Sequence, residues 1–222
     1  MQYQTDKESV VEEATKLQYA KRGSVLVKNL QKRHFEAYYC ENKEQALKKA
    51  LELIPQGALV GWGGTMTAKQ IGLLEALNQG NYVTLDREKG KTPEEVREIK
   101  YKCFHADFFI SGTNGISLDG QLVNLDGNGS RVAPFIFGPK NVLVVVGMNK
   151  VTDTVEEAVK RVRTIAAPMN QQRFLRATPC TVTGSCGNCL SEDCICNQLV
   201  ITRHCSPMGR IKIIVIGENL GF

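Results

Sequence analysis

The sequence predicts an α/β protein with a mostly parallel sheet that is flanked by helices. Short apolar, β-prone segments alternate along the chain with segments of helical periodicity, which is the order of elements found in α/β folds. Most of these apolar segments are continuous and lack polar alternation, as expected for strands that are covered on both faces. The 222 residues, 42% of them hydrophobic, are enough for one core. We therefore expect a single domain over residues 1–222.

The individual elements follow from local patterns. Residues 1–33 contain mostly good helix formers and predict a helical lead-in of one or two helices, interrupted at Gly23. Asp119 and Gly120 are a strong turn signal and predict a hairpin within residues 116–125, which adds an antiparallel piece. Further helices are predicted near residues 42–54, 67–76, 92–102 and 154–166. The predicted strands span residues 35–40, 58–62, 82–85, 107–111, 141–147 and 212–217.

Composition and charge exclude several classes of function. The net charge of +5 is small and spread along the chain without an arginine-rich block, so we expect no nucleic-acid partner. No apolar run approaches the roughly 18 to 20 residues of a membrane-spanning helix, so we expect no membrane segment. The first residues lack the basic and apolar regions of a secretory signal, which predicts a cytoplasmic protein.

Three glycine-rich turns after predicted strands form the first candidate site. In open parallel sheets, ligands bind beyond the carboxyl ends of the strands, where glycine lets the backbone approach them and helix N-termini favour anions. Each turn alone is equally typical of a structural turn, but three turns at one sheet edge favour a site for a small anionic metabolite. The predicted ligand-binding residues are Gly61, Gly63, Gly64, Thr65 and Thr67, then Thr113 and Asn114, then Gly127, Asn128, Gly129 and Arg131.

The same edge contains the candidate catalytic residues Asp126, Arg131 and Lys150. A guanidinium can clamp a carboxylate or phosphate through two parallel hydrogen bonds, and Asp126 can orient a hydroxyl group. Lys150 follows the most hydrophobic predicted strand and therefore points toward the same edge. These residues leave open whether the chain is an enzyme by itself.

A cysteine-rich loop at residues 178–206 interrupts the α/β pattern before the last strand and predicts a metal site. Disulfides are rare in the cytosol, and Cys186 and Cys189 have the C-x-x-C spacing of zinc and iron–sulfur sites. We predict Cys180, Cys186, Cys189 and Cys196 as ligands, with Cys194 outside the set. An iron–sulfur cluster and zinc both remain open as the metal. The alternatives are a purely structural zinc or disulfides formed after lysis.

Five motifs of this chain together resemble the LUD family, named for lactate utilisation. They lie at residues 61–67, 107–120, 129–134, 144–151 and 166–173, and the likeness runs from about Asp6 to Phe222. The resemblance implies a fold of the NagB/RpiA/coenzyme A transferase-like superfamily. It also implies a role as a subunit or accessory protein in iron–sulfur-dependent oxidation of L-lactate to pyruvate, together with other lactate-oxidation subunits.

Other features limit what the resemblance implies. The chain has no flavin or NAD fingerprint, and residues 111–115 lack the glutamate nucleophile of related transferases. Related sugar-phosphate isomerases use a carboxylate and a lysine, for which Asp119 or Asp126 and Lys150 are candidates. The alternative function is therefore a stand-alone enzyme that binds a phosphorylated or acyl-CoA-type small molecule at the glycine-rich edge. A homo-oligomer is compatible with either function.

Overall fold

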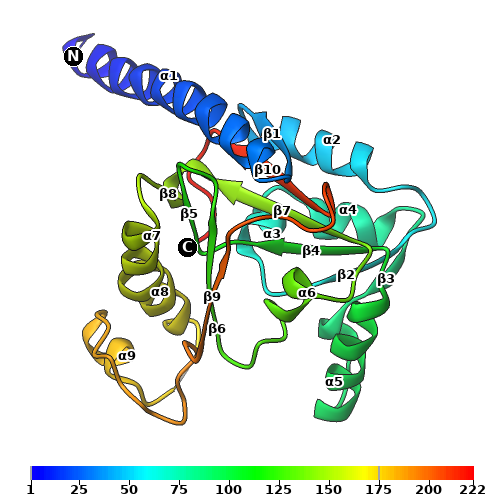
Figure 1. Cartoon of the computed structure of the whole chain (residues 1–222). Helices are drawn as coiled ribbons and strands as arrows, with labels where there is room; N and C mark the ends of the chain where they lie inside the picture. Colours follow the sequence, from blue (N-terminus) through cyan, green and yellow to red (C-terminus); the bar gives the residue numbers. More distant parts are fainter. Residues whose placement is uncertain (1, 175) are drawn as a thin grey trace.

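The centre of the computed structural model, which describes residues 2–174 and 176–222, is a six-stranded sheet (Figure 1). Its order is β1-β10-β7-β4-β2-β3, and every neighbouring pair is parallel. The predicted α/β fold with a mostly parallel sheet is therefore confirmed. The strands are β1 (Glu36–Cys40), β10 (Ile211–Ile216), β7 (Asn141–Gly147), β4 (Phe108–Gly112), β2 (Leu59–Trp62) and β3 (Val83–Leu85).

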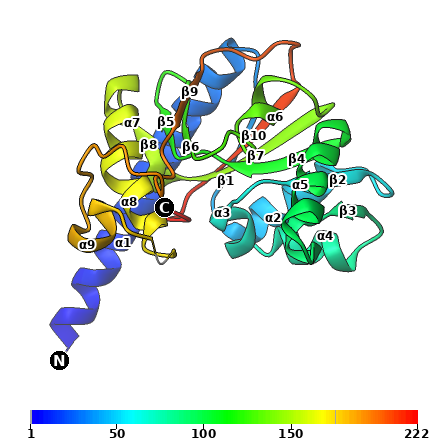
Figure 2. The ribbon, with the colours of Figure 1, turned by 90° about the horizontal axis from the view of Figure 1, so that it is seen from below.

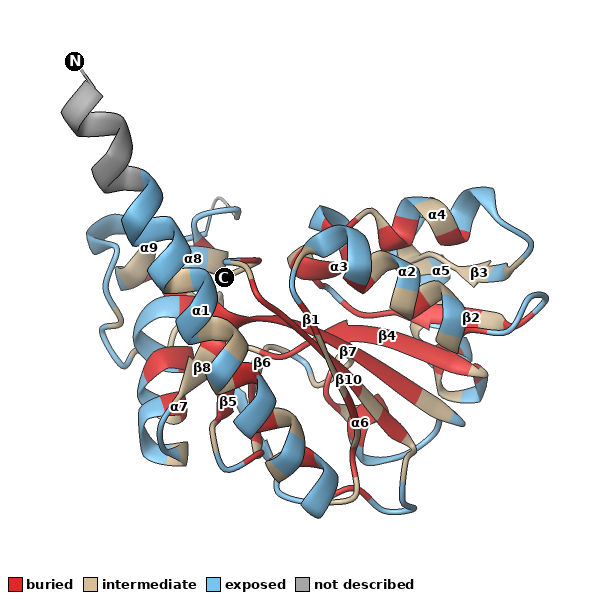
Figure 3. Ribbon diagram, turned by 90° about the horizontal axis from the view of Figure 1, so that it is seen from above, coloured by how far each residue is buried: buried red, intermediate tan, exposed pale blue. Residues whose placement is uncertain are grey.

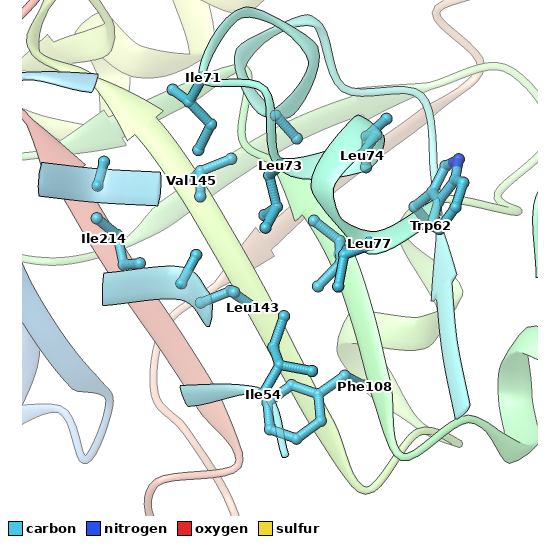
Figure 4. Close-up of a cluster of buried hydrophobic side chains, with 14 of the residues drawn as sticks. Ile54, Trp62, Ile71, Leu73, Leu74, Leu77, Phe108, Leu143, Val145 and Ile214 are labelled. Atoms are coloured by element: carbon cyan, nitrogen blue, oxygen red, sulfur yellow. The ribbon is translucent and has the colours of Figure 1, made fainter. Parts of the chain in front are cut away.

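Helices cover both faces of this sheet, which explains why its central strands are continuous apolar runs (Figure 3). On one face lie α2 (Lys43–Leu53), α3 (Met66–Gln70) and α4 (Leu73–Gln79), whose apolar side chains form a core with the strands (Figure 4). The other face packs against α1 (Gln2–Lys32), α6 (Ala133–Ile136) and the second sheet. The remaining helices are α5 (Pro93–Lys102), α7 (Val155–Arg161), α8 (Ala167–Gln171) and α9 (Pro179–Thr183).

A second sheet of four strands lies beside the first, in the order β8-β5-β6-β9. Its strands are β8 (Val151–Thr152), β5 (Gly115–Ser117), β6 (Leu122–Asp126) and β9 (Gln198–Thr202). The antiparallel pairing of β5 with β6 confirms the predicted hairpin. Strand β9 was not predicted; it lies within the cysteine-rich loop and pairs antiparallel with β6 from Leu122 to Asp126. The loop is therefore attached to the fold through a strand of its own.

Three predicted helices differ from those in the structure, and one of them, predicted at residues 154–166, is α7 followed by a π-helix at Val162–Ala166. The lead-in is one continuous helix and is not interrupted at Gly23. A Cβ atom at Gly23 would lie 2.3 Å from the Tyr39 ring, so this glycine permits close packing of α1 on β1. The helix predicted at residues 67–76 divides into α3 and α4 because Gly72 adopts a left-handed conformation, with φ at +76°. Among the described residues, no helix is long and apolar enough to cross a membrane.

Candidate functional site

A pocket of about 550 Å³, called the basic pocket below, lies at the carboxyl ends of β2, β4 and β7. Phe222 lines this pocket, and Figures 1 and 2 show the C-terminal end of the chain between α3 and α8. This is the sheet edge at which ligands bind in open α/β folds. The predicted residues that line the basic pocket are Gly64, Thr65, Thr113, Asn114, Asp126, Gly127, Asn128, Arg131 and Lys150.

The other predicted binding residues lie behind this lining. A Cβ atom at Gly61 would lie 2.5 Å from the Cys103 sulfur, and one at Gly63 would lie 2.7 Å from Arg131 Cγ. Both glycines therefore permit close packing of neighbouring side chains. Gly129 has a positive φ, and its N–H donates to Asp126 Oδ1 at 2.9 Å, which places it in a structural turn. The fourth, Thr67, is fully buried.

Arg131 joins the glycine-rich turns to one another. Its guanidinium donates to side-chain oxygens of Asn114 and Asn124, both at 2.7 Å, and to the backbone oxygens of Gly112 and Leu125. Its Nε also lies 3.4 Å from Asp126 Oδ2. All three guanidinium nitrogens thus face protein acceptors. Clamping a ligand through two of them, as predicted for Arg131, would require breaking some of these contacts.

Lys150 is buried at the inner end of the basic pocket. Only 5% of the residue is exposed, and its Nζ donates to Thr67 Oγ1 at 3.2 Å. Thr67 in turn donates to the Leu220 backbone oxygen, so the C-terminal segment closes over both side chains. Burial, together with the nearby positive charges of Arg161 and Arg131, lowers the pKa of Lys150 to about 7. Near neutral pH this amine is therefore present in both protonation states.

Positive charge dominates the lining of the basic pocket. Asp126 has the one side-chain carboxylate among the lining residues that the structure describes, and it pairs with Arg131. The pocket is also lined by cations that were not predicted, and no local sequence signal marks them because they come from segments far apart in the chain. The arrangement attracts an anion of small or moderate size. The lining cations are Arg87, Lys100, Arg131, Lys150, Arg173 and Arg176.

A second pocket, of about 330 Å³, is lined by five cysteines of the loop and is called the cysteine pocket. The Cys194 and Cys196 sulfur atoms lie 2.8 Å apart, and Cys189 also hydrogen-bonds with Cys194. Cys180 lines the same pocket, but its sulfur contacts the Thr178 hydroxyl at 3.3 Å. Cys194 lies outside the predicted ligand set. It nevertheless interacts directly with two predicted ligands, Cys196 and Cys189.

The thiols of the cysteine pocket influence each other's ionisation. Burial raises the pKa of Cys196, and its hydrogen bond with Cys194 and the charges of Cys194, Cys186 and Cys189 raise it further. Burial also opposes ionisation of Cys194, but hydrogen bonds from Cys196 and Cys189 outweigh it and lower the pKa of Cys194. One thiolate is thus stabilised by neighbouring thiols, which is a suitable starting point for a thiolate metal site.

The donor set of this pocket fits a thiophilic metal. Thiolates are the ligands of structural zinc sites and of iron–sulfur clusters, and all eight cysteines of the chain are free. Within residues 2–174 and 176–222, no three His, Cys, Asp or Glu side chains are arranged to hold a metal ion as they stand. Shared coordination would therefore require the thiols to rotate toward a common point in the pocket.

The basic pocket and the cysteine pocket share a wall. Leu125, Cys194, Ile195 and Asn197 line both of them. This wall is fixed to the third glycine-rich turn, because the Asn197 N–H donates to the Asp126 backbone oxygen at 2.9 Å. The Asn197 side chain also donates to the Gly127 backbone oxygen at 3.1 Å. The two candidate sites come from separate parts of the sequence, and β9 brings them together through its pairing with β6.

One solved structure that covers most of the chain has a similar fold. A crystal structure of a DUF162 family protein from Deinococcus radiodurans is similar, with a TM-score of 0.52, 12% identity, and coverage of 89% of this chain and 98% of that chain. Ribose 5-phosphate isomerase A from Neisseria gonorrhoeae matches 51% of this chain and 54% of its own, at 16% identity and a TM-score of 0.33. A search of curated proteins finds no match. The LUD domain model matches residues 24–216, so the chain belongs to the LUD domain family, the lactate-utilisation family that its motifs resemble.

Proposed function

We propose that this protein is a cytoplasmic subunit or accessory protein of iron–sulfur-dependent oxidation of L-lactate to pyruvate. In this role the basic pocket binds the carboxylate of the small acid, and the cysteine pocket holds the iron–sulfur centre. The observation that carries the proposal is the shared wall, since Cys194 lines both pockets. A bound acid would lie next to a group that can accept electrons. Further lactate-oxidation subunits are the expected partners.

The chemistry of each pocket supports its assigned part. The cations of the basic pocket exceed its single described side-chain carboxylate, which favours an anionic ligand. The thiols of Cys186, Cys189, Cys194 and Cys196 match the ligand type of iron–sulfur clusters. When bound, such a cluster would supply one-electron transfer, which none of the described side chains provides. Zinc accepts the same thiolates but has no redox chemistry, so it is the competing outcome.

The metal is tested on protein purified without oxygen. We expect brown protein that contains iron and sulfide and loses its colour with chelator plus oxidant. Cys194→Ser and Cys196→Ser should each lower the iron content several-fold, whereas Cys40→Ala, in the core on β1, should not. Comparing Cys180→Ser with Cys194→Ser identifies the fourth ligand. Colourless protein with one zinc per chain would contradict the electron-transfer role.

Anion binding is tested separately by thermal unfolding with L-lactate and with pyruvate. A ligand that binds only the folded state raises the midpoint temperature, and at a fixed concentration the rise is larger for a tighter ligand. We expect a rise with either acid that is reduced in Arg173→Met, because Arg173 lines the basic pocket. Lys160→Met on α7 changes an exposed lysine and is the matched control. The carboxylate assignment fails if neither acid changes the midpoint of the wild-type protein.

One observation favours a second candidate function. The basic pocket offers six cations and about 550 Å³, which is more charge and space than a three-carbon acid requires. A stand-alone enzyme that acts on a phosphorylated or acyl-CoA-type molecule would use this additional capacity. The same unfolding assay with a sugar phosphate and an acyl-coenzyme A distinguishes the two functions. A larger shift with these ligands than with pyruvate would favour the second candidate.

A further inference from the structure

Lys150 has the surroundings of a nucleophilic lysine. It lines the basic pocket with its charge-bearing end buried, and its Nζ has one hydrogen bond, to Thr67 Oγ1 at 3.2 Å. The backbone of Gly221 approaches so closely that a Cβ atom there would lie 2.7 Å from Nζ. The amine is therefore held in place by α3 on one side and by the C-terminal segment on the other.

The charges around Lys150 disfavour its protonated form. The charged groups that act on it are Arg161 and Arg131, and both repel a second positive charge. In the described part of the chain, no carboxylate forms an ion pair with Lys150, because Asp126 pairs with Arg131 instead. Burial and these two cations lower the pKa of Lys150 to about 7. Desolvation and neighbouring cations are the means by which enzymes turn lysine into a neutral nucleophile.

We propose that the Lys150 amine condenses reversibly with the carbonyl group of a 2-oxo acid held in the basic pocket. The nitrogen forms a bond to the carbonyl carbon, and the carbonyl electron pair and a proton from nitrogen go to oxygen. The carbon–oxygen bond then breaks, this oxygen leaves as water with the second proton of the nitrogen, and an imine links Lys150 to the acid. Water is the sole by-product, so the step requires no oxidant or reductant.

The pocket explains why the ligand is a 2-oxo acid. A carboxylate beside the reacting carbonyl would compensate the positive charges of Arg161 and Arg131 that act on Lys150. Thr67 can exchange protons with the amine because its hydroxyl already accepts the hydrogen bond from Nζ. This inference rests on the proposed function, in which pyruvate occupies the basic pocket. It adds that Lys150 reacts with the pyruvate carbonyl.

The experiment is reductive trapping of the full-length protein with pyruvate and cyanoborohydride at pH 7.5. The expected result is a mass increase of one reduced pyruvyl group, located on Lys150 by peptide mapping. L-lactate, which has no carbonyl group to condense, should give no adduct. In Lys150→Met the adduct should disappear, whereas Lys160→Met, which changes an exposed lysine, should retain it. Peptide mapping of wild-type protein keeps the test valid even if the Met variant does not fold.

The outcomes separate this inference from the proposed function. If pyruvate raises the unfolding temperature but no adduct forms, imine formation is wrong and carboxylate binding stands. If the adduct is distributed over surface lysines, the inference is likewise overturned. If pyruvate neither binds nor reacts, both fail. An adduct at Lys150 that saturates with pyruvate concentration supports both.

Discussion

Lys150 is a buried lysine whose protonation links the stability of the fold to pH. Its pKa of about 7 lies below the ordinary value of 10.5, so between these values the unfolded chain binds more protons than the folded chain. Stability should therefore rise with pH across this window, and the cost of the buried charge is fully present below about pH 7. Each unit by which the pKa is lower in the folded than in the unfolded state reduces the free energy of unfolding at low pH by about 1.4 kcal/mol.

Lys150→Met should remove this pH dependence. We expect the stability of wild type relative to Lys150→Met to increase by about 3 to 4 kcal/mol between pH 6 and pH 10, measured by urea unfolding. Lys160→Met, an exposed lysine on α7, should keep a constant difference from wild type over the same range. A flat difference for Lys150→Met would mean that this amine is not perturbed in the folded protein.

Arg131 stabilises the structure of the site by linking its turns. Arg131→Met would leave Asp126 buried without its cation and Asn124 Oδ1 without its donor, and it would remove one of the two donors to Asn114 Oδ1. Breaking a buried pair from one side commonly costs about 3 to 5 kcal/mol, so we expect a loss of about 3 kcal/mol or more in denaturant unfolding.

The matched control is Lys140→Met, which removes an exposed ion pair with Asp107; the Lys140 side chain is 76% exposed. Exposed pairs contribute less than about 1 kcal/mol, so this variant should stay close to wild type. Equal losses in the two variants would show that Arg131 does not hold the turns together.

At the scale of elements, the packing of α1 on β1 depends on a glycine in the middle of a helix. Alanine at position 23 would gain about 1 kcal/mol of helix propensity. Its Cβ, however, would lie 2.3 Å from the Tyr39 ring, whose hydroxyl is itself confined by Gly217. Overpacking of this kind costs about 1 to 3 kcal/mol, which exceeds the gain. We therefore expect Gly23→Ala to lower the free energy of unfolding by about 1 kcal/mol.

Ser24→Ala, at the exposed neighbouring position of the same helix, is the control for helix propensity alone. It should be neutral or slightly stabilising in the same urea experiment, because it adds no atom against β1. If Gly23→Ala behaved like Ser24→Ala, α1 would not be packed on Tyr39 as the structure shows.

The elements that sequence could predict are those whose pattern reflects burial. The central strands are apolar on both faces, so their residues alone identify them. Strand β9 could not be found in this way, because it is an edge strand that pairs with β6 alone and much of it is exposed. Gly72 interrupts a helical pattern without any change in hydrophobicity, so periodicity could not locate the break between α3 and α4.

The candidate site was predictable only in part for a related reason. Turn residues after strands indicate where a ligand can bind, and most of the predicted ones do line the basic pocket. A glycine pattern does not reveal whether the space beside it belongs to a ligand or to a side chain. At Gly61 and Gly63 it belongs to Cys103 and to Arg131. Cations such as Arg87 reach the pocket through tertiary contacts, which have no local signature.

At the scale of the whole molecule, the two pockets are joined by one short segment. Residues 194–197 form part of both linings and are hydrogen-bonded to Asp126 and Gly127. A metal bound by Cys194 and Cys196 would restrict this segment and with it the wall of the basic pocket. A ligand that meets an already ordered wall loses less conformational entropy on binding. Occupancy of one pocket should therefore strengthen binding in the other.

We expect pyruvate to bind at least about five-fold more tightly to metal-loaded protein than to metal-free protein, measured by titration calorimetry without oxygen. Binding free energies are reciprocal, so pyruvate should strengthen metal retention against a chelator by the same factor. Asn197→Ala removes the side-chain bond to Gly127 and leaves the cysteines intact, so it should reduce the coupling while both pockets still bind. Equal pyruvate affinities in the two forms would show that the shared wall does not couple binding in the two pockets.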